Sequence, residues 1–288
     1  MDPAIFFIQV LNGIQYGLLL FLVASGLTLI FGIMGIINLA HGSFYMVGAY
    51  LAFSLTQTLG SFWLALAAGL VIAVALGLAL EWLVMRLLYD RDHLYQVLLT
   101  YGLILVFEEL RSLVWGDDVH GVAVPAALAG SVPVGETMAY QVYRLGISGI
   151  CIAVALAMAW MIQRTRLGMI IRAGAVNREM VEALGLPIGL LYRLVFALGV
   201  ALAALAGMLA APVSSVFPGM GGQVLIISFV VVVIGGIGSV KGAFVAALAI
   251  GLADTFGKVL LPQIAGMVVY LLMAAVLLWR PQGLFGRG

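Results

Sequence analysis

One stretch near the start of the chain holds no charged residue: the 78 positions from 3 to 80 contain no Asp, Glu, Lys or Arg. No soluble globule could bury so long an apolar stretch. A bilayer span needs about 20 apolar residues, so this stretch suits about three helices and their turns. Over all 288 residues, 65% are hydrophobic and 9% are charged, against about a quarter in soluble domains. The sequence therefore predicts an all-α polytopic membrane protein, and it argues against a soluble enzyme or a nucleic-acid binder.

Apolar runs bounded by Gly, Pro and charged residues predict a single transmembrane domain over 1–288, with eight or nine spanning helices. The run 222–239 also suits a re-entrant or broken segment. The nine expected helices cover 7–33, 43–60, 62–88, 94–114, 146–163, 193–213, 222–239, 242–260 and 264–280.

The basic residues predict the orientation, because short cytoplasmic loops carry an excess of Lys and Arg. The connection 164–193 is rich in Arg, whereas 115–145 has Arg144 against three acidic residues. We therefore expect the N-terminus outside and the C-terminus in the cytoplasm. The outer connection should be a small extracytoplasmic cap of turns, with room for a hairpin. The single cysteine, Cys151, excludes an intrachain disulfide and is expected to be a core residue.

The cytoplasmic loop 164–193 contains the signals of a short helix. An N-cap residue, Asn177, is followed by about two turns, and Gly185 and Pro187 end them. The apolar residues of this helix need a covering surface, which is either the chain's own bundle or a partner protein. The segment comprises Asn177, Arg178, Glu179, Met180, Val181, Glu182, Ala183, Leu184, Gly185 and Leu186.

Two breaks interrupt the apolar pattern, one at Asn38–Ser43 and one around 235–242, and together they hint at repeated halves. Polar groups and Gly within a bundle either satisfy broken backbone or line a cavity, and both roles remain open here. The second break is not a phosphate-binding loop, because Lys241 is followed by Gly242 instead of Ser or Thr. No metal site is expected. The candidate pathway residues are Asn38, His41, Gly42, Ser43, Gly235, Gly236 and Gly238.

Four segments, in order along the chain, resemble signatures of the permease subunits of branched-chain amino-acid ATP-binding-cassette (ABC) importers, in particular the shorter of the two permeases. They are 38–50, 172–185, 233–239 and 280–286.

The resemblance implies a type II importer in a prokaryotic cytoplasmic (inner) membrane, with a broken helix. It would move branched-chain or other apolar amino acids, or related small amides and acids, by alternating access. Its partners would be a second, non-identical permease, two cytoplasmic ATPases and an extracytoplasmic binding protein. ATP and Mg would bind the ATPases, so this chain would be no enzyme and hold no cofactor. Residues 177–186 would form the coupling helix.

Two other mechanisms have some support in the residues. Asp254 lies within an expected span, where an intramembrane carboxylate is a functional candidate for an ion-coupled carrier. Lys258 is its i+4 neighbour, so an intrahelical ion pair is the simpler interpretation. Gly146–Gly149 matches the Gly-x-Ser-Gly pattern of intramembrane serine proteases, with Ser148 as nucleophile. The catalytic His of that family follows the Ser, whereas all three histidines here precede it.

Overall fold

The computed structural model describes residues 3–89, 91–134, 138–185 and 187–286, apart from the side chains of Arg178, Glu179 and Glu182. Within these described residues, nine long helices lie at the nine expected places. They are α1 (Pro3–Met34), α2 (His41–Leu59), α3 (Phe62–Leu83), α4 (His93–Trp115), α5 (Val142–Arg164), α8 (Ile188–Ser214), α9 (Met220–Gly235), α10 (Val240–Leu260) and α11 (Ala265–Trp279).

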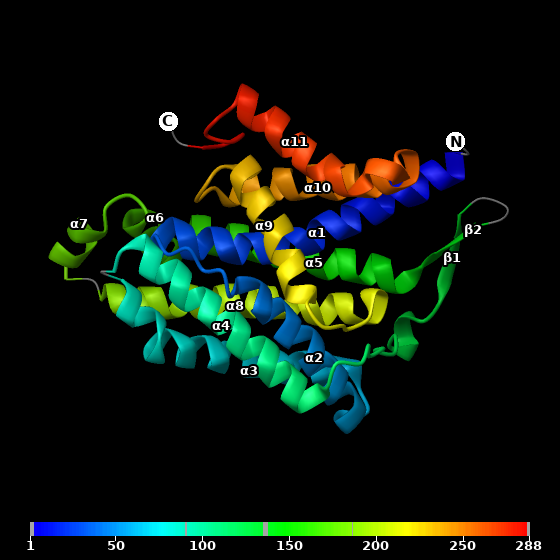
Figure 1. Ribbon diagram of the computed structural model, residues 1–288, viewed down its shortest axis with the longest axis horizontal. Coiled ribbons are helices and arrows are strands. Elements are labelled where there is room, and N and C mark those ends of the chain that lie inside the picture. Colours follow the sequence, from blue (N-terminus) through cyan, green and yellow to red (C-terminus); the bar gives the residue numbers. More distant parts are fainter. Residues whose placement is uncertain (1–2, 90, 135–137, 186, 287–288) are drawn as a thin grey trace.

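Shorter elements mark the two ends of the bundle (Figure 1). We call one end the hairpin end, because the antiparallel strands β1 (Ser131–Val134) and β2 (Met138–Gln141) project from it near the N-terminus. The other is the α7 end, with the short helices α6 (Arg166–Gly174) and α7 (Arg178–Ala183) and the C-terminus. The remaining elements are the single 3-10 turns η1 (Met85–Leu88), η2 (Ala126–Leu128) and η3 (Pro262–Ile264).

The segment between α1 and α2 turns back into the bundle instead of crossing its end. Residues 35–40 are not helical, and Ile36, Asn38 and Ala40 in it are fully buried. In Figure 1 this segment runs from the α7 end back to the middle, where α2 begins. Irregular backbone is tolerated at membrane depth only where protein or a water-filled cavity surrounds it. The broken helix of the sequence analysis is therefore this return segment together with α2.

The second half of the chain repeats the first in the opposite direction. The long helix α8 runs from the α7 end to the hairpin end, residues 215–219 return to the middle, and α9 begins there (Figure 1). The packing repeats too, because α1 lies against α10 as α8 lies against α3. The expected match between the breaks at Asn38–Ser43 and 235–242 is wrong: the counterpart of 35–40 is 215–219, and 235–242 is the turn between α9 and α10.

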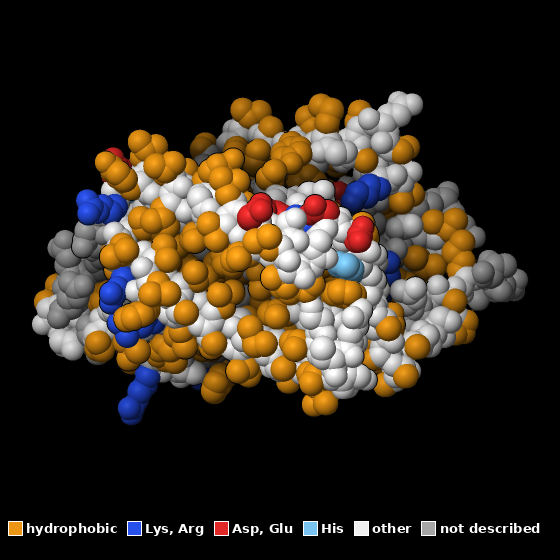
Figure 2. All heavy atoms as spheres, turned by 60° about the horizontal axis from the view of Figure 1, so that its bottom comes forward, with side chains coloured by type: hydrophobic (Ala, Val, Ile, Leu, Met, Phe, Trp, Pro, Cys, Tyr) orange, Lys and Arg blue, Asp and Glu red, His pale blue; other side chains and the backbone are white. Residues whose placement is uncertain are grey.

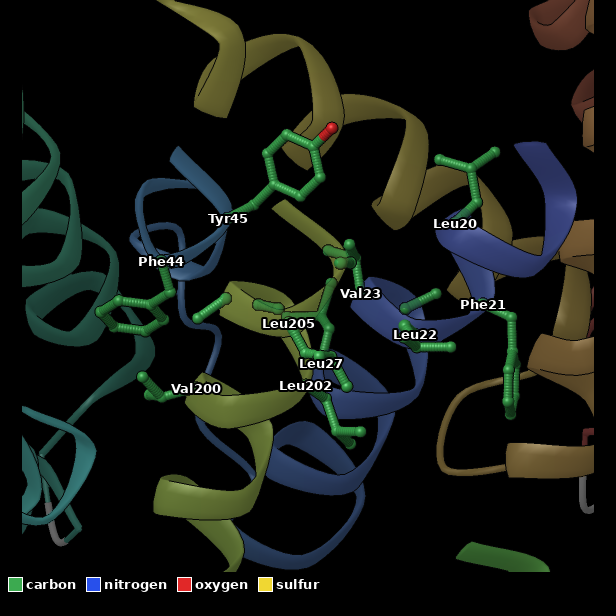
Figure 3. Packing of buried hydrophobic residues seen from close by; sticks show 14 of the residues in the cluster. Leu20, Phe21, Leu22, Val23, Leu27, Phe44, Tyr45, Val200, Leu202 and Leu205 are labelled. Carbon is green, nitrogen blue, oxygen red and sulfur yellow. The ribbon is translucent and has the colours of Figure 1, made fainter. Parts of the chain in front are cut away.

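The core lies where α1, α2 and α8 meet, and Figure 3 shows buried leucine, valine and aromatic side chains that come from these three helices. These helices approach one another so closely that some positions have no room for a Cβ atom and need glycine. A Cβ at Gly26 of α1 would collide with the backbone of Gly199 on α8, and one at Gly42 of α2 would overlap the carbonyl oxygen of Gly221 on α9. Small residues pack membrane helices backbone to backbone in this way.

The surface has the apolar character expected of a membrane protein. In the part of the chain that the structure describes, six helical segments are long and apolar enough to span a bilayer: Pro3–Met34, Phe62–Leu83, Val142–Arg164, Ile188–Ser214, Val240–Leu260 and Pro262–Trp279. The other three long helices fall short by this measure; α9, for example, has 16 residues. Figure 2 shows hydrophobic side chains across the middle of one face and several Lys and Arg side chains at the α7 end.

Candidate functional site

A cavity of about 470 Å³ opens in the hairpin half of the bundle. One face of α1 lines it along its depth, with residues from Gln9 to Val23, which span about 21 Å of helix. Its volume falls within the range of pockets that hold small molecules. The remaining lining comes from Tyr45 of α2, Arg144 of α5, the end of α8, the start of α9 and one face of α10.

The character of the lining changes with depth. Near the hairpin end it is polar, with Gln9, Asn12 and Arg144 beside Asp254 and Lys258. The deeper residues are mostly apolar and buried, namely Leu19, Leu20, Val23, Ala210 and Met220, whereas Gln223 of α9 is polar and exposed. Beside Met220, α2 and α9 cross at Gly42 and Gly221 with no room for even a methyl group. The lining on α9 ends at Val224, so the cavity reaches from the hairpin half to the first turn of α9 and no further along that helix.

The charged groups of the cavity come from α5 and α10 and contact about one turn of α1, from Asn12 to Tyr16. Lys258 Nζ is 2.6 Å from Asp254 Oδ2 and lies over the ring of Tyr16. This confirms the expected i,i+4 pair. Arg144 Nη1 donates to Asn12 Oδ1 at 3.0 Å and to Gln15 Oε1 at 3.5 Å. Among the described residues, no carboxylate pairs with Arg144.

A second buried carboxylate lies at the α7 end. Glu81 of α3 is 1% exposed, its Oε2 lies 3.2 Å from Arg193 Nε of α8, and its Oε1 accepts a hydrogen bond from Tyr89. The ring of Tyr192 packs edge-on against Tyr89. Burial, followed by the hydrogen bond to Glu81, raises the pKa of the Tyr89 hydroxyl. This cluster ties α3 to α8, and Arg193 lies only ten residues after α7 ends.

The predicted coupling segment forms a short helix, α7, at the position expected. Asn177 Oδ1 accepts a hydrogen bond from Met180 N, which is the N-cap, and Gly185 ends the segment with φ +78°. Met180 and Leu184 are 57% and 71% exposed and lie one turn apart. Val181 is buried within the chain, so for this residue the covering surface is the chain's own bundle, one of the two alternatives left open by the sequence. Leu186 and the side chains of Arg178, Glu179 and Glu182 lie outside the described structure.

The polar residues of the first break bond to backbone. Asn38 Oδ1 accepts from Ala40 N, and His41 Nε2 lies 3.0 Å from the Val23 oxygen. Both side chains are fully buried, and Ser43 is 4% exposed. Asn38, His41, Gly42 and Ser43 surround the start of α2, beneath the cavity but outside its lining. Their part in a pathway stays a prediction.

The glycines of the second break lie at the α7 end, under the C-terminal tail. Gly235 packs on Gly242, Gly236 on Gly283 and Gly286, and Gly238 near Gly32. The tail donates from Leu284 N to Ile234 O and from Phe285 N to Gly235 O, so it caps the last carbonyls of α9. None of these glycines lines the cavity, and a pathway role for them is a prediction without support from this geometry.

The alternative chemistries find no assembled site in the described chain. Ser148 donates to Arg144 O within its own helix, and the three histidines contact other residues. No group of three or more His, Cys, Asp or Glu residues that could hold a metal occurs there. Cys151 is buried and free, as expected.

The sequence interpretation missed most of the cavity's polar lining. Gln9, Asn12 and Tyr16 follow one another at helical spacing inside the charge-free stretch, and that periodic polar face was the signal. The Glu81–Arg193 contact had no comparable signal, because its members lie far apart in the sequence and Arg86 is the nearer cation.

Comparison with known proteins agrees with this architecture. The sequence profile of the family described as "Branched-chain amino acid transport system / permease component" matches residues 9–277. The high-affinity branched-chain amino acid transport system permease protein BraD of Pseudomonas aeruginosa is 32% identical over 97% of this chain and 95% of its own length. The corresponding protein LivH of Escherichia coli K12 is 31% identical with the same coverage.

A more distant relative is the probable branched-chain amino acid transport permease protein LivH of Methanocaldococcus jannaschii, 26% identical over 96% of this chain and 92% of its own length. These matches cover nearly the whole bundle, including the return segments, the cavity and α7. The chain is therefore a multi-pass membrane protein that belongs to the branched-chain amino-acid transport permease family.

Proposed function

We propose that the chain is the membrane-spanning permease subunit of an ATP-driven importer for branched-chain or other apolar amino acids. The observation that carries the proposal is the combination of a half-open cavity with an exposed short helix at the opposite end. A permease that works by alternating access needs a cavity closed at one end and a contact through which a motor acts. The relatives BraD and LivH, named as branched-chain amino acid transport permeases, suggest the substrate class.

The hairpin end is the extracytoplasmic end in this proposal. The α7 end carries Arg164, Arg166, Arg172 and Arg193, and short cytoplasmic loops hold such an excess of basic residues. The N-terminus then lies outside and the C-terminus inside. The cavity receives the amino acid from a binding protein on the outer side.

The α7 helix is the docking element for a cytoplasmic ATPase. Met180 and Leu184 form an exposed apolar pair, a typical anchor for a partner's groove. Because α7 leads directly into α8, and the far end of α8 lines the cavity, a push on α7 reaches the cavity along one helix of 27 residues. ATP and Mg bind to the ATPase in this scheme, and a second, non-identical permease completes the pathway.

The test co-expresses this chain with its ATPase and second permease subunits and replaces both Met180 and Leu184 by Ser. We expect loss of ATPase co-purification and of ATP-driven amino-acid uptake into proteoliposomes, with an unchanged unfolding temperature. The matched control is Leu87→Ser, which removes a 61%-exposed apolar residue at the same end outside α7. Retained coupling in the double variant would refute the docking role. Uptake by this chain alone, driven by an ion gradient and abolished by Asp254→Asn, would establish a carrier instead.

A further inference from the structure

The cavity holds two cations and one anion in an arrangement that its own contacts do not neutralise. Asp254 is 8% exposed and binds Lys258 through Oδ2 alone; no donor among the described residues hydrogen-bonds its Oδ1. The Lys258 side chain is 63% exposed, so its ammonium group has room to move away. The Asp254 carboxylate is therefore a ready acceptor for a second ammonium group.

Arg144 supplies the opposite charge. Its guanidinium donates to the neutral amide oxygens of Asn12, Gln15 and Gln141, and in the described chain it has no acidic partner. Neutral amides orient an arginine without cancelling its charge, and arginine binds carboxylates through a planar pair of donors. A carboxylate that enters the cavity mouth thus meets an oriented, uncompensated cation.

The apolar depth of the cavity completes the pattern. Below the charged level, Leu19, Leu20 and Val23 of α1 face Met220 of α9. A molecule with an ammonium, a carboxylate and one branched apolar arm would place its charges at the mouth and its arm below. Free apolar amino acids have this chemistry.

We propose that Asp254 and Arg144 form a head-group site for a zwitterionic amino acid inside the permease itself, and that Lys258 competes with the ligand's ammonium group for Asp254. This inference rests on the proposed function. It adds a selective site within the membrane, which an importer that relied on its binding protein alone for selectivity would not need. Lys258 keeps the buried carboxylate paired while the cavity is empty. The ligand's ammonium takes its place on Asp254 when the cavity fills.

The experiment measures binding of radiolabelled leucine to the assembled permease–ATPase complex in lipid nanodiscs, without the binding protein. Asp254→Asn and Arg144→Gln should each weaken binding about tenfold, since each removes a hydrogen bond between charged groups. Lys258→Gln should strengthen binding severalfold, because it removes the competitor. The control Glu109→Gln, which changes an exposed carboxylate at the same end on α4, should leave binding unchanged.

Two analogues identify the groups that are recognised. 3-Methylbutylamine, which lacks the carboxylate, and 4-methylpentanoate, which lacks the ammonium group, should displace leucine at least tenfold less well than leucine itself. Weaker binding in Lys258→Gln, or equal displacement by all three compounds, would overturn the proposal. The proposal expects Lys258→Gln to strengthen leucine binding and Asp254→Asn to weaken it. If the ion pair were purely structural, both substitutions would weaken leucine binding.

ATP-driven leucine uptake with the binding protein present is measured in parallel. Uptake by the wild-type complex together with no binding difference among the variants would refute the head-group site and leave the importer function standing. Absence of ATP-driven uptake in the wild type would refute the importer function itself. Should Asp254→Asn fail to fold, Arg144→Gln and Lys258→Gln still decide the question.

Discussion

Asp254 and Glu81 are both buried carboxylates on counterpart helices of the two inverted halves, α10 and α3, yet they are held in different ways. The partner of Asp254 is Lys258, one turn along the same helix, and the pair opens onto the cavity. The partner of Glu81 is Arg193 of another helix, and Tyr89 covers the pair. A local pair can exchange its cation without moving a helix. The pair at the α7 end joins two helices, so one end has a pair open to ligand and the other a pair that ties α3 to α8.

The difference between the two ends depends first on the close contact of α2 with α9 that separates them. Disrupting this contact should have the largest effect on stability. Gly42→Ala would force a methyl group onto the Gly221 carbonyl, and overpacking of this kind costs about 3 kcal/mol. Gly222→Ala, one position away from that contact and with nothing within 4 Å of the new methyl group, is the matched control. Unfolding of the detergent-solubilised protein measures both. Equal stability of the two variants would mean that α2 and α9 do not meet here.

The next largest effect should be the difference between the two ion pairs in what each contributes to the free energy of unfolding. Arg193→Gln leaves Glu81 buried without a cation and should cost about 2 kcal/mol, below the full cost of an unpaired buried charge because Arg193 is half exposed. Lys258→Gln should cost less, about 1 kcal/mol, because Lys258 is 63% exposed and the Asp254 carboxylate opens onto the cavity. The double variant Arg193→Gln, Glu81→Gln should recover part of the loss. Equal costs for Arg193→Gln and Lys258→Gln would erase the contrast.

The α7 end is also held by the C-terminal tail, whose removal should have a smaller effect. Gly283 has φ +80° and lies against Gly236, so Gly283→Ala should displace the tail from the last carbonyls of α9. Two lost hydrogen bonds cost about 1–2 kcal/mol. Gly266→Ala, which meets no atom within 4 Å, is the control, and limited proteolysis of the tail is the measurement. A tail equally protected in both variants would contradict this assignment.

The smallest effect is expected from an exposed carboxylate at the hairpin end. Hydrogen bonds from Arg111 and Ser112 hold the pKa of Asp117 below its usual 3.8. Its contribution to stability is therefore complete above about pH 4 and is lost as the pH falls through the lowered pKa. Asp117→Asn should flatten the acid limb of the stability curve slightly and leave neutral stability almost unchanged. A large loss at pH 7 would show that exposed charges at this end matter as much as buried ones.

The sequence predicted the helices better than the contacts between them. Nine helices, the N-cap at Asn177 and the Asp254–Lys258 pair follow from local patterns of apolar residues, capping residues and i,i+4 spacing. The Gly42–Gly221 crossing and the Glu81–Arg193 contact join residues far apart in the chain, and the return of residues 35–40 to mid-depth depends on the helices around it. No local pattern encodes such packing, so neither the cavity nor the Glu81–Arg193 contact was predicted.

The central claim is that the bundle is open from the hairpin end as far as the first turn of α9, beside its crossing with α2, and closed beyond that turn. Single cysteines on α9 test it directly, in a Cys151→Ala background and with a membrane-impermeant thiol reagent added from the hairpin side. Gln223 lines the cavity, whereas Ser228, about 7.5 Å further along the same helix, is fully buried. The account predicts rapid labelling of Gln223→Cys and no labelling of Ser228→Cys. Comparable labelling of both positions, or of neither, would contradict it.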